Sequence, residues 1–188
     1  MKGGAVPARC GLLARNGPVP VGGMSMMVSG PGFSREMRRG EEAGVDALLR
    51  AAFGGDDEVR LVHKLRKSGD MAGEMVQPWG DGIVGYYALS RMKAPKGWLC
   101  LAPVAIAPDH QRHRIGQRMV GLLTEWARIS GTTVVVLGQP GFYGRAGFSL
   151  ERAGKLTSPY PVTQTLLAGP GVDVPEETLI YPRAFEGL

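Results

Sequence analysis

The stretch 104–118 has the residue types of an anion-binding turn between a strand and a helix. An apolar run favours a strand, a polar and basic turn follows, and the apolar spacing after it predicts a helix. The first N–H groups of a helix have no internal partners, and the helix dipole adds positive charge there. Gly116 permits close approach to the backbone, and Arg112, Arg114 and Arg118 add charge. This pattern indicates a phosphate site, although an ordinary solvated basic turn has the same composition.

Other reactive residue types are placed less favourably. His110 and His113 have no further His or Cys nearby, so no metal site is expected. Cys100 lies in an apolar run, where a cysteine usually acts as a small buried hydrophobe. Cys10 and Cys100 are far apart and belong to no CxxC pair, which favours a reducing, cytoplasmic setting.

Charge is unevenly distributed over the 188 residues. The net charge is +5, and residues 1–33 hold three basic residues and no acid, which leaves +2 for residues 34–188. The sequence pI of 9.5 suggests nucleic-acid binding, but most of the excess charge lies outside the part expected to fold. Binding to nucleic acid is therefore not expected. No apolar run approaches the roughly 18 residues of a membrane helix, so no membrane association is expected either.

Domain organisation follows from composition. Residues 1–32 hold eight Gly, four Pro and no acid, without sustained periodicity, so a flexible tail is predicted. Residues 33–188 are predicted to form a single domain, since about 150 residues suit one hydrophobic core.

Apolar spacing predicts three longer helices. Their expected ranges are 41–53, 56–67 and 115–129. Gly54, Gly69 and Gly131 follow them as stop signals, and Asp56 and Asp57 can cap the second helix. The residues expected on the buried face of the third helix are Ile115, Met119, Leu122, Leu123 and Trp126.

The remaining elements are expected to be strands and one short helix. Predicted strands cover 33–39, 71–77, 83–91, 97–107, 132–137, 148–152 and 178–181, and the short helix covers 140–146. The strands at 83–91 and 97–107 should form an antiparallel hairpin. The continuous apolar run 132–137 suits a buried strand, which completes a strand–helix–parallel strand unit. An α/β (α+β) protein with a mixed sheet is therefore predicted, with 153–175 as a connection rich in Pro and Gly.

Three motifs resemble the GNAT N-acetyltransferase superfamily. The turn is similar to its motif A, Q/R-x-x-G-x-G/A, with Gln111 first, Gly116 last and Arg114 where the family has its first Gly. Segment 136–148, with its Tyr-x-Arg-x-Gly-Phe core at 143–148, resembles motif B, and 81–86 looks like the family's turn into its third strand. Segments 53–66 and 181–185 are similar to one bacterial GNAT subgroup, so the likeness covers about 33–186.

This resemblance implies a split central sheet that holds acetyl-CoA between two diverging strands. The pyrophosphate would sit on the amides of 113–118, and the pantetheine would pair with the backbone of 104–106 like an added strand. The cofactor-binding residues that follow from the resemblance are Val104, Ala105, Ile106, Gln111, Arg112, His113, Arg114, Ile115, Gly116, Gln117 and Arg118. Val104 and Ile106 can pack in the core at the same time.

The activity that the resemblance implies is acetyl transfer from acetyl-CoA to a primary amine by direct attack. Tyr143 occupies the general-acid position, although it could merely pack beside Phe142. Glu74, Asp81 and His63 are candidate bases that no spacing distinguishes. The alternatives are a non-catalytic acyl-CoA-binding regulatory module on the same fold and, third, a nucleic-acid-binding protein. The connection 153–175 is expected to shape the acceptor site or a homodimer contact.

Overall fold

The computed structural model describes residues 32–187, so the predicted tail lies outside the described residues except for Gly32. A six-stranded sheet forms its centre, with the strands in the order β1-β2-β3-β4-β5-β6. The strands are β1 Arg35–Glu36, β2 Met71–Trp79, β3 Gly82–Arg91, β4 Leu99–Ile106, β5 Val134–Leu137 and β6 Thr165–Ala168. β4 and β5 are parallel and all other neighbours are antiparallel, which confirms the predicted mixed sheet and hairpin.

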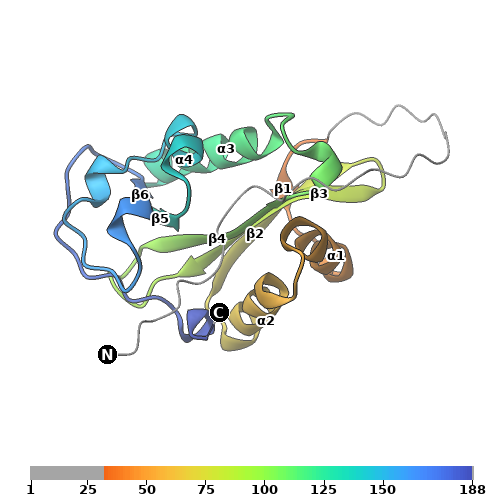
Figure 1. Ribbon diagram of the computed structural model, residues 1–188, viewed down its shortest axis with the longest axis horizontal. Helices are drawn as coiled ribbons and strands as arrows, with labels where there is room; N and C mark the ends of the chain where they lie inside the picture. The colour runs from red at the N-terminus through yellow and green to blue at the C-terminus, as the bar shows by residue number, and fades with distance from the viewer. Residues whose placement is uncertain (1–31, 188) are drawn as a thin grey trace.

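Helices cover both faces of the sheet (Figure 1). Helices α1 Glu42–Phe53 and α2 Asp57–Ser68 pack on one face, and α3 Ile115–Ser130 and α4 Pro140–Arg145 lie on the other. Short 3-10 turns are η1 Pro108–His110, η2 Glu151–Ala153, η3 Val162–Gln164 and η4 Arg183–Phe185. Among these 156 described residues, no helix is long and apolar enough to span a bilayer.

The three long helices end where their stop signals predict. Gly54, Gly69 and Gly131 each follow a helix with φ between 72° and 76°, the left-handed conformation that glycine adopts at low cost. The expected cap at α2 is different, because the Asp56 side chain makes no capping hydrogen bond and instead accepts one from Arg50 Nε at 2.7 Å.

The buried face of α3 differs from the predicted one. Ile115, Met119 and Leu123 are buried as expected, but Leu122 and Trp126 are exposed. The buried arc is shifted around the helix toward the side that packs on β4 and β6, where Val120, Thr124 and Ala127 are buried. Helical spacing alone did not show which side of the apolar arc meets the sheet.

The C-terminal third is less regular than predicted. Segments 148–152 and 178–181 form only single bridges, Ser149 with Leu167 and Ile180 with Ala94, and Thr178 pairs once with Thr157. The strand β6 instead lies within the stretch that was expected to be a connection, and all four of its residues are buried.

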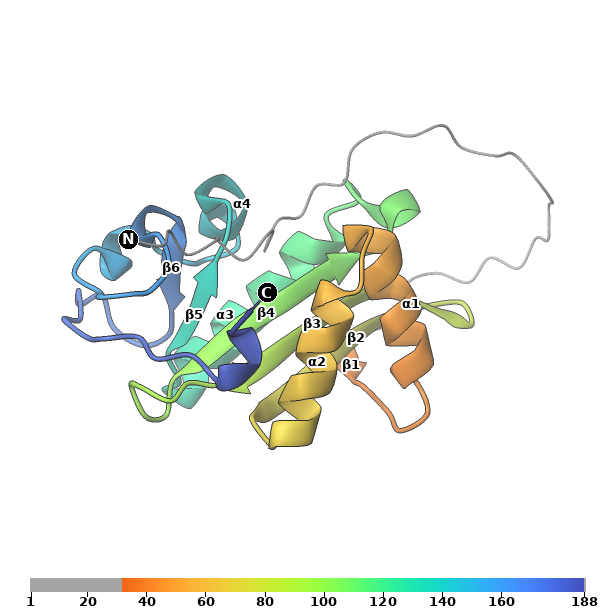
Figure 2. The ribbon, with the colours of Figure 1, turned by 60° about the horizontal axis from the view of Figure 1, so that its bottom comes forward.

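The sheet splits between β4 and β5 (Figure 2). β5 pairs with Leu99, Cys100 and Leu101 of β4 and with no later residue of that strand. On its other side, β4 follows β3 to its end, with a register shift after Leu101. The second half of β4 therefore has one paired edge and one edge that faces the gap between the diverging strands, as expected for a split sheet.

Gly85 lies where the α3 face of the sheet is most crowded. A Cβ added there would be 2.6 Å from Met119 Sδ, 2.9 Å from Gln77 Cβ and 3.0 Å from Ile106 Cδ1. We expect Gly85→Ala to lower the free energy of unfolding by about 1–3 kcal/mol, because overpacking forces neighbours from their preferred positions. Urea unfolding measures this loss. Gly73→Ala is the matched strand control, since nothing lies within 4 Å of its added carbon; an equal loss in both variants would contradict the crowding argument.

Candidate functional site

The loop between β4 and α3 has a special backbone conformation. Arg112 has φ of 67° and Arg114 has φ of 60°, and they are the two non-glycine residues with positive φ among residues 32–187. Arg114 also precedes the first residue of α3. Left-handed residues in a turn direct successive N–H groups into a concave anion-binding surface. The loop is therefore shaped for an anion, even though arginine stands where glycine adopts this backbone more easily.

The N-terminus of α3 points its free donors into the same region. The N–H of Arg118 makes the first helical bond, to the carbonyl oxygen of Arg114 at 2.9 Å. The N–H groups of Ile115, Gly116 and Gln117 have no acceptor in the described part of the chain. Three free amides at the positive end of a 16-residue helix form an anion site.

A pocket of about 230 Å³ opens at this helix end. The residues that line it are Ile106, His110, Gln111, Arg112, Arg114, Ile115, Gly116, Gln117, Gln139, Phe142 and Arg145. Seven of these were predicted as cofactor ligands, whereas Val104, Ala105, His113 and Arg118 lie outside the lining. Val104 and Ala105 have buried side chains, on opposite faces of the sheet, which leaves only their backbone for pairing.

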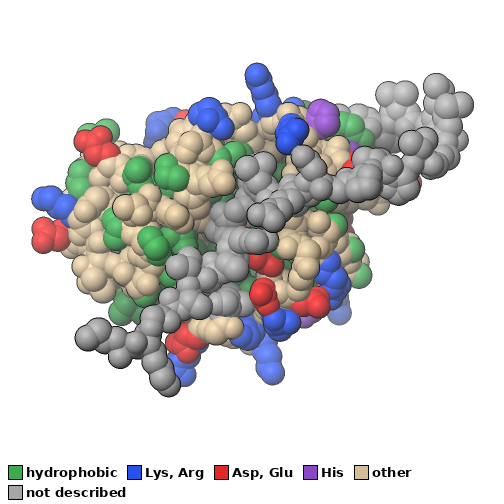
Figure 3. Space-filling model, viewed as in Figure 1, with side chains coloured by type: hydrophobic (Ala, Val, Ile, Leu, Met, Phe, Trp, Pro, Cys, Tyr) green, Lys and Arg blue, Asp and Glu red, His purple; other side chains and the backbone are tan. Residues whose placement is uncertain are grey.

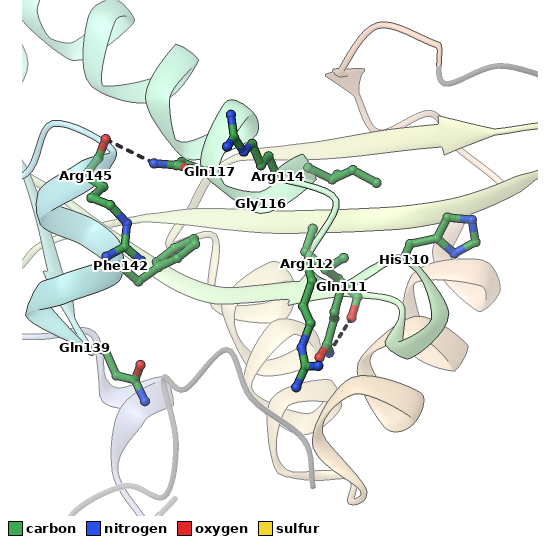
Figure 4. Close-up of a pocket in the computed structure, with 11 residues that line it drawn as sticks. His110, Gln111, Arg112, Arg114, Gly116, Gln117, Gln139, Phe142 and Arg145 are labelled. Atoms are coloured by element: carbon green, nitrogen blue, oxygen red, sulfur yellow. Dashed lines mark hydrogen bonds between the residues drawn. The ribbon is translucent and has the colours of Figure 1, made fainter. Parts of the chain in front are cut away.

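The ionised side chains that line the pocket are all positively charged. Three arginines and no carboxylate line it, and these guanidinium groups make no ion pair within residues 32–187. Figure 4 shows Arg112 and Arg114 pointing to opposite sides of the loop, while Arg145 approaches from α4 beside Phe142. Figure 3 shows Lys and Arg side chains gathered along the upper margin, over α3 and the loop before it. Such a pocket favours a ligand with several negative charges.

Gln111 connects the loop to the free half of β4. Its amide Nε2 donates to the carbonyl oxygen of Ile106 at 3.1 Å. The next N–H, of Ala107, donates to Val84 of β3 at 2.8 Å. Neighbouring residues of a strand direct their backbone groups to opposite sides, so the N–H of Ile106 faces the gap toward β5. That donor is available to a group in the split.

Tyr143 lies behind the pocket and does not line it. Its ring is 2% exposed and makes edge contacts with Phe142 and Phe148, with ring centroids 4.9 Å and 5.7 Å apart. It belongs to the same buried cluster as Val104 and Ile106, whose side chains lie on the α3 side of the free half of β4. These contacts are what we expect of a Tyr143 that only packs beside Phe142. The role of Tyr143 as general acid stays a prediction.

The candidate bases are engaged elsewhere or lie away from the pocket. Glu74 accepts hydrogen bonds from Arg66 at 2.7 Å and from the Tyr86 hydroxyl at 2.6 Å. Burial, reinforced by the Glu74 carboxylate, raises the pKa of Tyr86 above its usual range, so this phenol remains a donor. His63 bonds Asp46 at 2.9 Å. Neither these residues nor Asp81 line the pocket. In residues 32–187 no three His, Cys, Asp or Glu side chains form a metal-binding group.

Comparison with known proteins identifies this arrangement. An acetyltransferase (GNAT) domain matches residues 75–150. The uncharacterized N-acetyltransferase YhbS of Escherichia coli is 33% identical over an alignment of 130 residues that covers 65% of this chain and 76% of that protein. The chain belongs to the GNAT acetyltransferase family. It is therefore an enzyme of the N-acetyltransferase class, as its motifs predicted.

Solved GNAT structures share the fold. The crystal structure of YhbS from E. coli in complex with CoA aligns with a TM-score of 0.73 at 25% identity, over 87% of this chain and 96% of that one. A GNAT acetyltransferase from Brucella melitensis in complex with acetyl-CoA aligns with a TM-score of 0.69 at 25% identity, over 82% and 97% of the two chains. Both alignments cover more than four fifths of this chain, so its six-stranded sheet is a GNAT sheet.

Four pocket residues of this GNAT enzyme were not predicted. They are His110, Gln139, Phe142 and Arg145. Phe142 and Arg145 lie in the segment that resembles motif B. That resemblance could have indicated them, but only Tyr143 was named as a site residue from it. His110 packs edge-on against Trp79 with centroids 4.9 Å apart, and this contact depends on strands distant in sequence.

Arg114→Gly tests the departure from motif A. We expect affinity for acetyl-CoA to change by less than about threefold, because the helix amides remain and Arg112 and Arg145 still supply positive charge to the pocket. Relief of the left-handed strain, about 1 kcal/mol, offsets the greater freedom of glycine in the unfolded chain. Calorimetric titration measures the affinity, with Arg114→Ala as the control that removes charge but keeps Cβ. A loss above tenfold in both variants would make the guanidinium a ligand.

Proposed function

We propose that this acetyltransferase binds acetyl-CoA at the α3 pocket and transfers the acetyl group directly to a primary amine. The observation that carries the proposal is the combination of three free helix amides with a pocket lined by arginines and no acid. A pyrophosphate is the part of acetyl-CoA that this surface suits. The CoA and acetyl-CoA bound by the YhbS and Brucella structures support the same ligand class.

The rest of the cofactor would follow the free half of β4. A pocket of about 230 Å³ is smaller than the sites of about 300–1,000 Å³ that enclose drug-sized ligands, so it suits only part of acetyl-CoA. The open edge of β4 after Leu101 offers backbone pairing to the pantetheine amides, and the N–H of Ile106 faces the split at the end of this edge. Val104–Ile106 would then contribute backbone atoms, which agrees with their buried side chains.

Transfer needs no covalent enzyme intermediate. The amine nitrogen attacks the thioester carbonyl carbon, the carbonyl π electrons move to oxygen, and the N–H of Ile106 would stabilise that oxyanion. The attacking nitrogen, which carries a positive charge after addition, releases a proton to solvent. As the carbonyl re-forms, the C–S bond breaks and its electrons leave with sulfur. The thiolate would take a proton from Tyr143 beneath the split, and solvent would return a proton to Tyr143. Products are an N-acetylated amine and CoA.

Two measurements test the proposal. Calorimetric titration with acetyl-CoA should show one site per chain, and release of free thiol should depend on an added amine from a panel of small primary amines and lysine peptides. Binding without amine-dependent release across the panel would favour a non-catalytic acyl-CoA-binding module. Absence of binding would overturn the pocket assignment, and a salt-dependent shift with DNA or RNA would favour nucleic-acid binding instead.

A further inference from the structure

One side of α3 carries apolar side chains that nothing in the described chain covers. Leu122, Trp126 and Ile129 are spaced i, i+4 and i+7, so they form one stripe along the helix. Their exposed fractions are 64%, 46% and 75%. Single exposed apolar residues are common, whereas a continuous stripe of three large ones marks a contact surface.

The stripe lies beside a part of the sheet that α3 leaves open. α3 packs mainly on β4 and β6, and Met119, one turn before Leu122, reaches back over Gly85 of β3. On β2, Ala72 and Met75 pack against the same buried cluster as Met119 but stay partly exposed. Nothing lies within 4 Å of a Cβ added at Gly73. The stripe and this shallow apolar region of β2 together form the α3–β2 surface.

Unpaired charges of opposite sign border the α3–β2 surface. Glu36 is the register partner of Met75 and is exposed at the sheet side. Arg118 is exposed one turn before Leu122 at the helix side and does not line the pocket. Within residues 32–187 neither side chain makes an ion pair or a hydrogen bond. The surface thus carries an acid on its sheet side and a base on its helix side.

We propose that a second copy of this chain covers the α3–β2 surface. In a two-fold contact the same patch meets itself, so the stripe of each copy would lie on β2 of the other. Arg118 would then meet the partner's Glu36, and the symmetric pair would form at the opposite rim. A stable dimer buries roughly 800 Å² on each partner, which requires the sheet region as well as the helix stripe. A dimer of this kind would be formed by α3 and β2 rather than by the connection 153–175.

Sedimentation velocity of the full chain over a wide range of protein concentration tests the assembly. We expect a dimer for the unaltered protein and, for Leu122→Arg, a dimer dissociation constant at least about 100-fold higher, because the variant sets a charge against an apolar surface. Val172→Arg is the matched control, since Val172 is 91% exposed and lies outside the surface; it should remain dimeric. Circular dichroism checks that Leu122→Arg stays folded.

A charge exchange tests the orientation independently. Arg118→Glu and Glu36→Arg should each weaken the dimer, and the double variant should restore it. Failure of the double variant to recover would overturn the two-fold arrangement. A monomer at every concentration, or an unaffected dimer in Leu122→Arg, would overturn the second copy as occupant; the monomer would leave residues 1–31 or another protein to cover the surface.

Discussion

Gly116→Glu is expected to lower the affinity for acetyl-CoA by at least about 100-fold. A Cβ at this position would lie 3.3 Å from Ile106 Cγ1 and 3.5 Å from Phe142 Cζ, two side chains that line the pocket. The longer side chain therefore cannot turn into the core and must extend among the phosphate donors. Its carboxylate would repel the pyrophosphate and compete for the arginines.

Two matched variants make this test specific. Gly116→Ala adds only the tight Cβ and should lower affinity a few-fold. Gly121→Glu introduces the same carboxylate on the same helix, where nothing lies within 4 Å of the added carbon, and should leave affinity unchanged. Calorimetric titration measures binding, and thermal unfolding confirms that the fold is retained. Normal affinity in Gly116→Glu would refute the placement of the pyrophosphate at α3.

Tyr143→Phe is expected to reduce kcat by about 10²–10⁴-fold with acetyl-CoA affinity close to normal. A proton donor to the leaving thiolate acts mainly in the transition state, so its loss lowers turnover more than binding. The change removes one hydroxyl and keeps the ring that contacts Phe142 and Phe148, so the packing should survive.

The buried position of Tyr143 makes its control important. Tyr160→Phe removes a half-buried hydroxyl outside the pocket and should leave kcat unchanged. Turnover is measured with an amine identified by the panel, under conditions in which chemistry limits the rate. If Tyr143→Phe then keeps full kcat, Tyr143 serves as a packing residue and water becomes the proton source.

Patterns among neighbouring residues predicted most of the helices and strands. The helices at 42–53, 57–68 and 115–130 combine apolar spacing with a following glycine, and both signals come from neighbouring residues. β6 was missed because four residues between Pro161 and Pro170 are too short to show a period. Its burial comes from pairing with β5, which the local sequence does not encode.

The lining of the pocket was predicted where it comes from the single loop before α3. Gln111, Gly116 and their neighbours follow each other in sequence, so their spacing could indicate that they lie together. Gln139 and Phe142 reach the pocket because α4 folds against α3, a tertiary contact that apolar spacing does not encode and to which only the resemblance of their segment to motif B pointed. Leu122 and Trp126 are the opposite kind of error. Their apolar spacing predicted burial, but both side chains are exposed on a surface that the described chain does not cover.

With acetyl-CoA bound as proposed, the free edge of β4 would link the supply of cofactor to the stability of the folded chain. The pairing of β4 with β5 ends at Leu101. The backbone of β4 after Leu101 is therefore free to pair with a ligand on that side. A ligand that occupies this position binds the folded chain and not the unfolded one. At a concentration about 100 times its dissociation constant it would add about 2.7 kcal/mol to the free energy of unfolding. A cell depleted of acetyl-CoA and CoA would thus hold a population of this enzyme that opens more often and is degraded sooner.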